Sequence, residues 1–576
     1  MMRKIDLNNC NLYVRSRIHY KRQVDEFWEK IQHDVELFRH QKIFFDNPWD
    51  MERCSDIFNF CKGIFDKTPN EDPEWVFQLC RFEWLSKFLL LYYKTKDLSL
   101  LKEWSEFVTL FFDRNNYKKD GGEKTQKKIT LGSRIISRIK SLFFKPNYPT
   151  YRTLDTAIRN YTLLINFVHC PDLFESVNRD QILSRIQDDS QYTYDNLRKF
   201  DDTSNWGIII ICSYLICNFI INTKREDYKI VYDKLIEMLN KQILPNGAHI
   251  ESSHMYHNQV LLYLLRLVFW ADKCKFVLPN DILTKVSIMA GYSRDFVAPN
   301  GNQDLFGDSD NTSLSTLLAV SDVILGKEKK LPLLDTPDFI LLNEFDFEYS
   351  SYMQSKVVTD SYTKDGITRL SCGDYIVFIY NTKFYSSHKH SDNGSFTLYY
   401  KNLPVIIDSG RYTYNDPYWR EYFKSRDSHS TIYVESDNLK SDQYSKDITE
   451  IVNEISVYNG EIQAHISYKT CDGGTLSRRF ILSSKWLEIY DEFIGVSSNI
   501  VHQNMILHPA VEPKGTCTCL VAGKYRLSYK TDYEVTQVIQ TWTSPHYNEK
   551  VKSFKIHMRG ILKGNNLKKT KIEING

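Results

Sequence analysis

The 576-residue sequence lacks several features that define large classes of proteins. None of its 12 cysteines forms a CxxC pair, so neither a zinc ribbon nor a disulfide scaffold is expected, and we predict reduced, buried thiols. Basic and acidic residues nearly balance, at 74 and 72, and a formal net charge of +2 creates no global field that attracts a polyanion. We therefore expect no nucleic-acid partner, and an acidic partner would have to be bound by a local patch.

Signals for export and for membrane insertion are also missing. The first 20 residues contain no apolar core and no small-residue cleavage site, so they do not resemble a secretory signal. The longest apolar run, 207–221, is shorter than the ~20 residues that a membrane span needs, and it contains Ser213 and Asn218. We predict a buried helix at this position and, from the sequence, a cytoplasmic protein.

The sequence contains two long stretches that differ in the length and spacing of their apolar segments. Residues 1–335 place apolar side chains at helical spacing, and several segments are apolar most of the way round, which favours a layered all-helical array. From residue 336 the apolar segments are short and β-branched or aromatic, and Asn, Gly, Asp and Ser separate them. We predict a multidomain α+β protein with a helical domain over 1–335 and an antiparallel β-sandwich over 336–576.

One segment, 117–146, fits neither pattern, because it carries nine basic residues and two acidic ones. Its second half has the spacing of a basic amphipathic helix, which would contact anionic lipid or a polyanionic substrate. The alternative is a solvated insertion with one apolar stripe docked on the protein. We favour the second interpretation, which makes membrane contact through this segment the weaker hypothesis.

The densest group of polar residues lies between 386 and 435. His388 and His390 are two residues apart, so on a strand both side chains project from one face. Asp408 ends an apolar strand, and His429 opens another. Two imidazoles and a carboxylate from neighbouring strands are a plausible zinc set with an open fourth position. Spacing alone leaves satisfied surface histidines as the commoner alternative.

Three further polar clusters stand just before apolar helices or turns. The first, NGAHIESSHMYHNQ, contains Glu251 and Tyr256; the second, DDTSNWG, contains Asn205; the third, LFGDSDNTS, contains Asp308 and Asp310. Each alone is more often a helix cap than an active site. Their common position matters, because loops that lead into the helices of a layered array tend to lie on one rim.

Taken together, these motifs resemble the heparinase II/III-type polysaccharide lyases. The run HKHSDNG, the later Asp-x-Gly at Asp408 and the strand opened by His429 resemble the C-terminal signature of that family, and NGAHIESSHMYH resembles its toroid motif. The stretches 73–97 and 151–160 resemble its N-terminal helices. The resemblance covers most of the chain, and it implies an incomplete (α/α) toroid followed by a β-sandwich, with the site in the cleft between them.

The resemblance also implies a reaction and a set of residues. The family cleaves uronic acid-containing polysaccharides by β-elimination, and a glycosaminoglycan such as heparin or heparan sulfate is the expected substrate. Asn205 would neutralise the uronate, Tyr256 would act as general acid or acid/base, and His388 would be the base. His390, Asp408 and His429 would hold a structural zinc ion. One departure is Trp206, because relatives commonly have His after the toroid Asn.

Planar guanidinium groups and tyrosines are the remaining candidates for substrate contact. A guanidinium matches a carboxylate or a sulfate, and structural ion pairing is the alternative role for each arginine. Tyrosines are suited to lining sugar subsites, and packing under a loop is the alternative for them. The candidates for substrate binding are Glu251, Arg159, Asp308, Arg411, Tyr414 and Tyr422, with Arg420 and Tyr412 as further members of the same groups.

Two other functions remain open from the sequence. A glycoside hydrolase on the same toroid would need two carboxylates across the sugar, and Glu251, Asp308 and Asp310 are the candidates. A non-catalytic protein that binds glycans or assembles a surface polysaccharide is the second alternative. The sequence does not indicate an oligomeric state.

Overall fold

The computed structural model describes most of the chain, in several ranges. They are 21–43, 45, 65, 68, 71–115, 149–173, 179–221, 228–331, 360–435, 440–458, 460–470, 473–495, 499–515, 517–562 and 567–576. Two predictions fall outside them: the basic segment 117–146 and the predicted domain boundary at residues 335 and 336.

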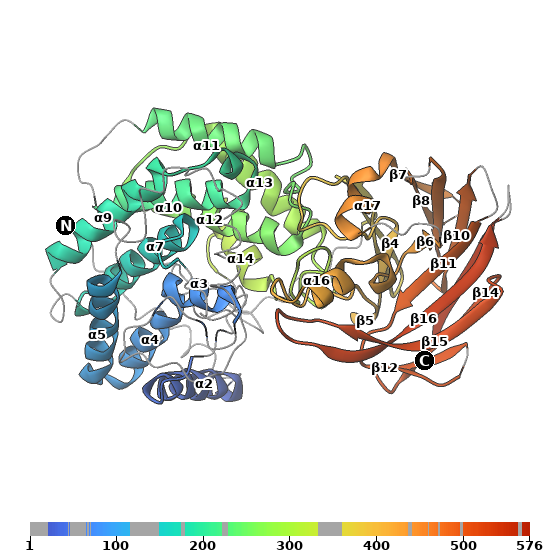
Figure 1. The fold of residues 1–576 in the computed structure, drawn as a ribbon, viewed down its shortest axis with the longest axis horizontal. Helices are drawn as coiled ribbons and strands as arrows, with labels where there is room; N and C mark the ends of the chain where they lie inside the picture. Colours follow the sequence, from blue (N-terminus) through green and yellow to red (C-terminus); the bar gives the residue numbers. More distant parts are fainter. Residues whose placement is uncertain are drawn as a thin grey trace, which may run out of the picture. The chain divides into compact units, whose positions relative to one another are not determined.

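The chain divides into two compact units. The first comprises Met1–Leu239, Leu262–Leu283 and Ala319–Met353, and the second comprises Asn240–Leu261, Thr284–Leu318 and Gln354–Gly576. The second unit thus takes in two segments of the helical part together with the strands. Helices occupy the N-terminal part of the chain and antiparallel sheets the C-terminal part, which confirms the predicted order (Figure 1).

The helices before residue 331 carry the apolar periodicity seen in the sequence. They are α2 (Lys21–Arg39), α3 (Pro73–Arg81), α4 (Ser86–Thr95), α5 (Leu98–Arg114), α7 (Thr153–His169), α9 (Arg179–Asp195), α10 (Asn205–Ile221), α11 (Lys229–Gln242), α12 (His254–Cys274), α13 (Asn280–Asp295) and α14 (Ser315–Ile324). Asp72 caps α3 and is followed by Pro73, and Asp97 caps α5. A capping carboxylate satisfies amide groups that the first turn of a helix leaves without partners.

The first unit has a core rich in aromatic rings. Trp104 is fully buried, and its ring lies 5.5 Å from that of Phe167 in an edge-on arrangement. Helices α7 and α10 are buried nearly all round, and α10 packs against α7 and α9. The predicted buried helix at 207–221 is therefore confirmed. Among the described residues, no helix is long and apolar enough to cross a membrane.

The strands that the structure describes in the second unit form three antiparallel sheets. The five-stranded sheet has the order β1 (Tyr362–Lys364), β2 (Ile367–Cys372), β3 (Tyr375–Tyr380), β4 (Ser395–Tyr400), β5 (Leu403–Ile406). The eight-stranded sheet has the order β12 (Val511–Pro513), β13 (Thr518–Val521), β14 (Tyr525–Thr531), β17 (Lys568–Asn575), β10 (Trp486–Ile494), β9 (Thr475–Leu482), β8 (Glu461–Lys469), β7 (Thr449–Tyr458). The four-stranded sheet has the order β15 (Val535–Thr543), β16 (Val551–Leu562), β11 (Asn499–Ile506), β6 (Ile432–Val434).

The five-stranded sheet is buried on both faces. Leu398 on one face joins a core that also contains Ile489 of the eight-stranded sheet and Met558 of the four-stranded sheet. The opposite face belongs to a second core, in which Phe378 meets Phe296 of the helical segments. A strand that is buried on both faces has a continuous apolar sequence, and YIVFIY of β3 is such a sequence. The sheet thus brings the loops after β3 and β5 against the helical segments of the same unit.

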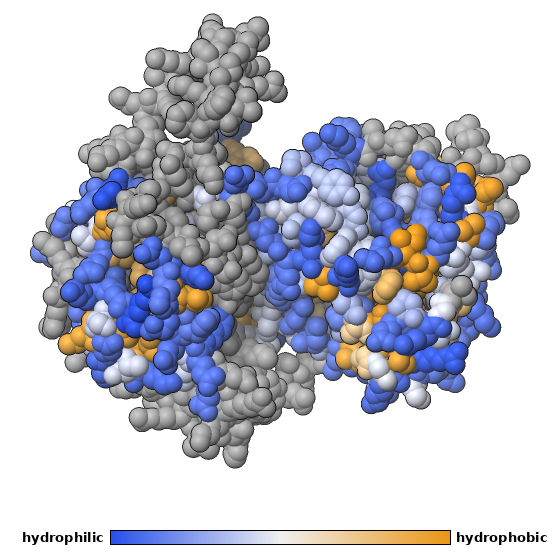
Figure 2. Space-filling model, turned by 60° about the horizontal axis from the view of Figure 1, so that its bottom comes forward, coloured by the Kyte–Doolittle hydropathy of each residue, from blue (hydrophilic) through white to orange (hydrophobic). Residues whose placement is uncertain are grey.

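The surface in Figure 2 is mostly hydrophilic, and its hydrophobic residues lie in small patches that hydrophilic residues separate. Exposed apolar side chains of the second unit include Val457 on β7 and Ile561 on β16. All described cysteines are free, and five of the eight are buried: Cys80, Cys170, Cys212, Cys217 and Cys519. The prediction that the thiols are buried is confirmed for these five residues.

Candidate functional site

The candidate site is assembled inside the second unit from segments far apart in the sequence. Tyr256 lies in the first turn of α12, and Asp308 lies in the loop between α13 and α14. His388 and His390 follow β3, Asp408 follows β5, and α16 (Pro417–Lys424) and a short helix lead from there to His429. The sequence clusters at 246–259, 305–313 and 386–435 therefore converge, as the family resemblance implies.

Glycine permits this convergence at two points. A Cβ on Gly307 would lie 2.3 Å from the carbonyl oxygen of Ser252 and 3.0 Å from that of His388, and the residue has a φ of +60°. A Cβ on Gly410 would lie 2.1 Å from the carbonyl oxygen of Ser544, at a φ of +79°. Only glycine tolerates both the close approach and the left-handed backbone at such positions.

Asp308 is the centre of the site. Its side chain is fully buried, and its Oδ2 lies 2.6 Å from Nδ1 of His388 while its Oδ1 lies 2.8 Å from Nε2 of His390. The guanidinium of Arg420 donates to both carboxylate oxygens, and the hydroxyl of Tyr414 donates to Oδ2 at 3.1 Å. Burial alone would raise the pKa of Asp308, but the charge of Arg420 and the histidine hydrogen bonds outweigh it and hold the pKa well below its usual range.

This carboxylate orients His388. Because Oδ2 of Asp308 is an acceptor, Nδ1 of His388 carries the hydrogen, and Nε2 is left with its lone pair. The His388 side chain keeps 23% of its surface exposed, whereas Asp308 has none. The ring of Tyr256 stacks on the imidazole, with centroids 3.9 Å apart and planes at 27°. The arrangement therefore presents the Nε2 edge of an imidazole beside a phenol.

A chain of hydroxyls links Tyr256 to Asp308. The hydroxyls of Tyr256 and Tyr414 are 2.9 Å apart, and Arg411 donates to the Tyr414 oxygen at 3.3 Å. Burial, followed by the charge of Asp308, raises the pKa of Tyr414 well above its usual range, so Tyr414 keeps its proton. Since Tyr414 gives that proton to Asp308, Tyr256 is the donor in the contact between the two hydroxyls.

A second group of ligand-type residues lies beside this network. His390, Asp408 and His429 each offer one atom within 4.8 Å of the others, and all three are buried. Nδ1 of His429 is 2.8 Å from Oδ2 of Asp408, and the other Asp408 oxygen accepts from the amide of Gly410. Nδ1 of His390 and Nε2 of His429 have no hydrogen-bond partner among the residues that the structure describes.

These residues fit a divalent metal ion. Two buried imidazole nitrogens without partners and an adjacent carboxylate form a donor set that the fold leaves incomplete. Burial lowers the pKa of His390 to about 4, so its imidazole is neutral and has a lone pair to offer. Its other nitrogen contacts Asp308, which is the usual arrangement of a carboxylate behind a metal-binding histidine.

Several predicted substrate-binding residues have structural contacts instead. Asp308 is enclosed by protein donors, and Arg411 is fully buried and forms a two-point ion pair with Asp310 at 2.8 and 3.0 Å. The hydroxyl of Tyr422 is 2.8 Å from Oγ1 of Thr541 on β15. Glu251 is 3% exposed, and its carboxylate lies 3.9 Å from Nδ1 of His249. Each of these four side chains is therefore held by contacts within the protein.

The remaining two predicted residues belong to the first unit. Arg159 is fully buried, and its guanidinium donates to the carbonyls of Cys80 and Thr150. We therefore withdraw Arg159 from the substrate-binding set, because its donors serve the helical core. Asn205 begins α10 and is 2% exposed, with its Oδ1 accepting from the hydroxyl of Ser204 at 3.2 Å.

Sequence reasoning missed the connection between the two histidines of the His-x-His run. It placed His388 in catalysis and His390 at a metal, and it treated Asp308 as a contact to substrate. In the structure Asp308 bridges both imidazoles across sequence separations of 80 and 82 residues. The only signal was the Gly-Asp pair at 307 and 308, and a glycine followed by an acidic residue is too common to indicate a partner.

Comparisons with known proteins agree with this geometry. Residues 46–324 match a family model described as the heparinase II/III N-terminus, and residues 361–573 match one described as heparinase II/III-like, C-terminal. No curated protein sequence matches the chain.

Solved structures share the fold at low sequence identity. A structure of heparinase III aligns with 16% identity and a TM-score of 0.70, over 95% of this chain and 85% of the other. The heparan sulfate lyase HepC from Pedobacter heparinus aligns with 16% identity and a TM-score of 0.58, over 95% and 83%. A chondroitin AC lyase from Streptomyces coelicolor aligns with 8% identity and a TM-score of 0.55, over 96% and 80%. The predicted toroid followed by a β-sandwich is confirmed.

Three buried histidines around Tyr256 predict sensitivity to acid. Burial lowers the pKa of His249 to about 3, of His254 to about 4 and of His257 to about 3. In the unfolded chain they titrate near 6.5, so below that pH unfolding takes up about one proton per histidine. We expect the free energy of unfolding to fall between pH 6.5 and 4, by about 1.4 kcal/mol per pH unit for each histidine.

Urea unfolding at pH 7, 6 and 5 measures this dependence. His254→Phe, which keeps a ring beside Phe306, should reduce the slope by about one proton, and replacement of the exposed Tyr458 by Phe, which removes no imidazole, should leave it unchanged. A stability that stays constant from pH 7 to 5, or an unaltered slope in His254→Phe, would contradict the prediction.

Proposed function

Because the chain belongs to the heparinase II/III-like family and is a polysaccharide lyase, we propose that it cleaves a uronic acid-containing polysaccharide by β-elimination. A glycosaminoglycan such as heparin or heparan sulfate is the proposed substrate, and solved relatives named for heparan sulfate and chondroitin support this class. The observation that carries the proposal is the stacked pair of Tyr256 and His388, an acid and a base whose rings are 3.9 Å apart.

The reaction needs a base, an acid and a group that neutralises the uronate. The base removes the proton from C5, the electron pair forms a C4–C5 double bond, and the glycosidic oxygen leaves C4 with a proton from the acid. A C5–H bond next to a carboxylate is a weak acid, so a donor must first reduce the negative charge of the carboxylate. We assign that task to Asn205, in the first turn of α10, where the positive end of the helix dipole adds to its amide.

We assign the base to His388. Its Nδ1–H is held by Asp308, which leaves the Nε2 lone pair to accept the C5 proton. The imidazolium that forms is stabilised by the carboxylate that already faces it. Asp308 stays ionised throughout because Arg420 neutralises it, so it positions the base and does not itself exchange the substrate proton.

We assign the acid to Tyr256. Its hydroxyl gives a proton to the leaving glycosidic oxygen, and the hydroxyl of Tyr414 then turns its hydrogen from Asp308 to the phenolate that remains, with the guanidinium of Arg411 behind it. Arg411 is held in place by Asp310, so the ion pair between them fixes the far end of this chain of donors. Positioned acid and base groups of this kind each contribute about 10²–10⁴ in rate.

We propose zinc as the metal held by His390, Asp408 and His429. Two imidazoles and a carboxylate are a common zinc donor set, and a fourth position would remain for water. When bound, the ion supplies a fixed positive charge that holds together the loops after β3, β5 and α16. His390 contacts Asp308 through its second nitrogen, so the orientation of Asp308, and through it of His388, depends on this group of ligands.

Hydrolysis by a carboxylate pair is disfavoured by the same contacts. A glycosidase needs one carboxylic acid and one carboxylate, both open to the sugar. Asp308 and Asp310 are buried and bound by arginines, and Glu251 is buried beside His249. The candidate carboxylates of the second unit are therefore committed to structural contacts, which leaves glycan binding without turnover as the alternative to be tested.

The first test is the release of unsaturated uronate. Purified protein is incubated with heparin, heparan sulfate, hyaluronan, chondroitin and alginate, and ultraviolet absorbance of the C4–C5 double bond is followed. We expect absorbance to rise with at least one glycosaminoglycan, because elimination creates the chromophore and hydrolysis does not. Folded, metal-loaded protein that produces no signal on any of the five polymers would overturn the proposal, and tight binding without product would indicate a glycan-binding protein.

The second test separates the acid from the base. Tyr256→Phe and His388→Gln keep the size of each ring or side chain and remove the proton-transfer group, so we expect kcat to fall by about 10²–10⁴ while circular dichroism stays unchanged. Tyr458→Phe, at an exposed position of the eight-stranded sheet, and His465→Gln, at a half-buried position of the same sheet, are the matched controls and should keep full activity. Full turnover by Tyr256→Phe would show that another group protonates the leaving oxygen.

The third test measures the metal without using activity. We expect elemental analysis of the purified protein to find about one zinc ion per chain, and both His429→Ala and Asp408→Ala to lose it together with thermal stability, because removal of one ligand leaves the other two buried without a partner. His465→Ala should retain the metal. A wild-type protein that binds no divalent metal after incubation with zinc contradicts the assignment.

A further inference from the structure

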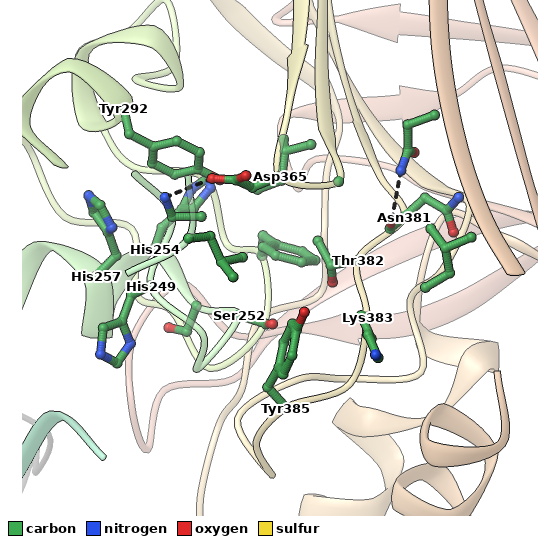
Figure 3. A pocket seen from close by; sticks show the side chains of 18 of the residues that line it. His249, Ser252, His254, His257, Tyr292, Asp365, Asn381, Thr382, Lys383 and Tyr385 are labelled. Atoms are coloured by element: carbon green, nitrogen blue, oxygen red, sulfur yellow. Dashed lines mark hydrogen bonds between the residues drawn. The ribbon is translucent and has the colours of Figure 1, made fainter. Parts of the chain in front are cut away.

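A cavity apart from the candidate site lies within the second unit. Neither Tyr256, His388 nor Asp308 is among the residues that line it. Its volume is about 520 Å³, within the range of pockets that hold small molecules. One wall carries His249, His254 and His257, and the other carries Thr382, Lys383 and Tyr385 from the loop after β3 (Figure 3). Residues 448–453, at the start of β7, complete the lining.

Several buried polar atoms of the lining have no partner. Oγ1 of Thr382, Nε2 of His254, Nδ1 of His257 and Oδ1 of Asn453 are buried, and none has a hydrogen bond among the described residues. A buried polar atom without a partner is destabilising unless a water molecule or a ligand supplies the missing hydrogen bond. Four around one cavity indicate a place that a polar ligand completes.

The imidazoles that line the cavity are neutral. Burial keeps the pKa of His254 at about 4 and that of His257 at about 3, so both are uncharged at neutral pH. The carboxylate of Asp365 already accepts from the side chain of Asn246 and the amide of Ala248, and Lys383 and Glu450 are exposed residues. The described lining contains no buried cation that would match an anionic ligand, in contrast to the arginines around Asp308.

The hydrogen-bonding groups that line the cavity are suited to a ligand that carries hydroxyl groups. A hydroxyl both donates and accepts, as do neutral imidazole and threonine, whereas an amide oxygen accepts. Apolar contacts come from Phe306 and Tyr292, and Tyr385 leaves 46% of its surface exposed, which provides a ring face for stacking. Hydroxyls arranged around an apolar ring face are the defining chemistry of a sugar.

We propose that this cavity binds a neutral, hydroxyl-rich ligand of mono- or disaccharide size, at a site separate from the pair of Tyr256 and His388. Both walls continue into the candidate site: the loop with Thr382 leads to His388, and Ser253, which also lines the cavity, donates to the carbonyl of Asp308. The ligand therefore lies against the segments that carry the proposed acid and base, without contacting either group.

Calorimetry and saturation-transfer NMR on the intact protein test the site, with glucose, N-acetylglucosamine and maltose as probes. We expect at least one probe to bind. Thr382→Val removes one hydroxyl at constant shape and should weaken binding about tenfold, and Tyr385→Ala, at an exposed position that folding tolerates, should weaken it as well. Tyr458→Ala is the matched control at another exposed tyrosine and should bind as the wild type does.

The His388→Gln variant locates the bound sugar. Binding that survives in His388→Gln and is weakened in Thr382→Val or Tyr385→Ala supports the cavity. Binding that is lost in His388→Gln and unchanged in both cavity variants places the sugar in the catalytic site and overturns the proposal, as does the absence of binding by all three probes. The measurement involves no turnover, so its outcome is independent of the lyase assay.

Discussion

The buried carboxylate of Asp308 is the interaction on which the site depends. It accepts hydrogen bonds from two histidines, an arginine and a tyrosine that come from three separate stretches of the chain after it. A full negative charge without solvent is stable only when it is surrounded by donors, and Arg420 supplies the compensating charge. Because one carboxylate contacts both His388 and His390, the same side chain positions the proposed base and one of the proposed metal ligands.

Two further constraints follow from the need to bury this charge. The backbone must approach closely, which Gly307 and Gly410 allow, and a second ion pair, between Arg411 and Asp310, stands beside the first. The acidic residues of this region therefore hold arginines and imidazoles in place. The chemistry left to the site is that of an exposed imidazole edge and a phenol, which suits proton transfer at carbon better than hydrolysis by paired carboxylates.

The candidate site and the cavity beside Thr382 are built partly from the same chain segments, but the charges of their side chains differ. Around Asp308 two arginines lie beside buried carboxylates, whereas around Thr382 the buried imidazoles are neutral, and one nitrogen each of His254 and His257 has no partner among the described residues. Burial explains the neutral imidazoles, because removal from water disfavours the charged form of a histidine. One polar segment, 249–257, thus contributes to two surfaces with different ligand chemistry.

The sequence by itself determined the order of helices and strands, and its resemblance to a family placed Tyr256, His388, His390, Asp408 and His429 in one predicted site. These depend on local periodicity and on motifs that keep their spacing. The tertiary structure alone decided that Asp308 bridges two histidines, that Arg411 and Tyr422 serve positioning contacts, and that Arg159 is buried in the helical core. Each of these placements depends on a contact between residues that are 79 to 119 positions apart along the chain, and no local pattern specifies which buried charge meets which donor.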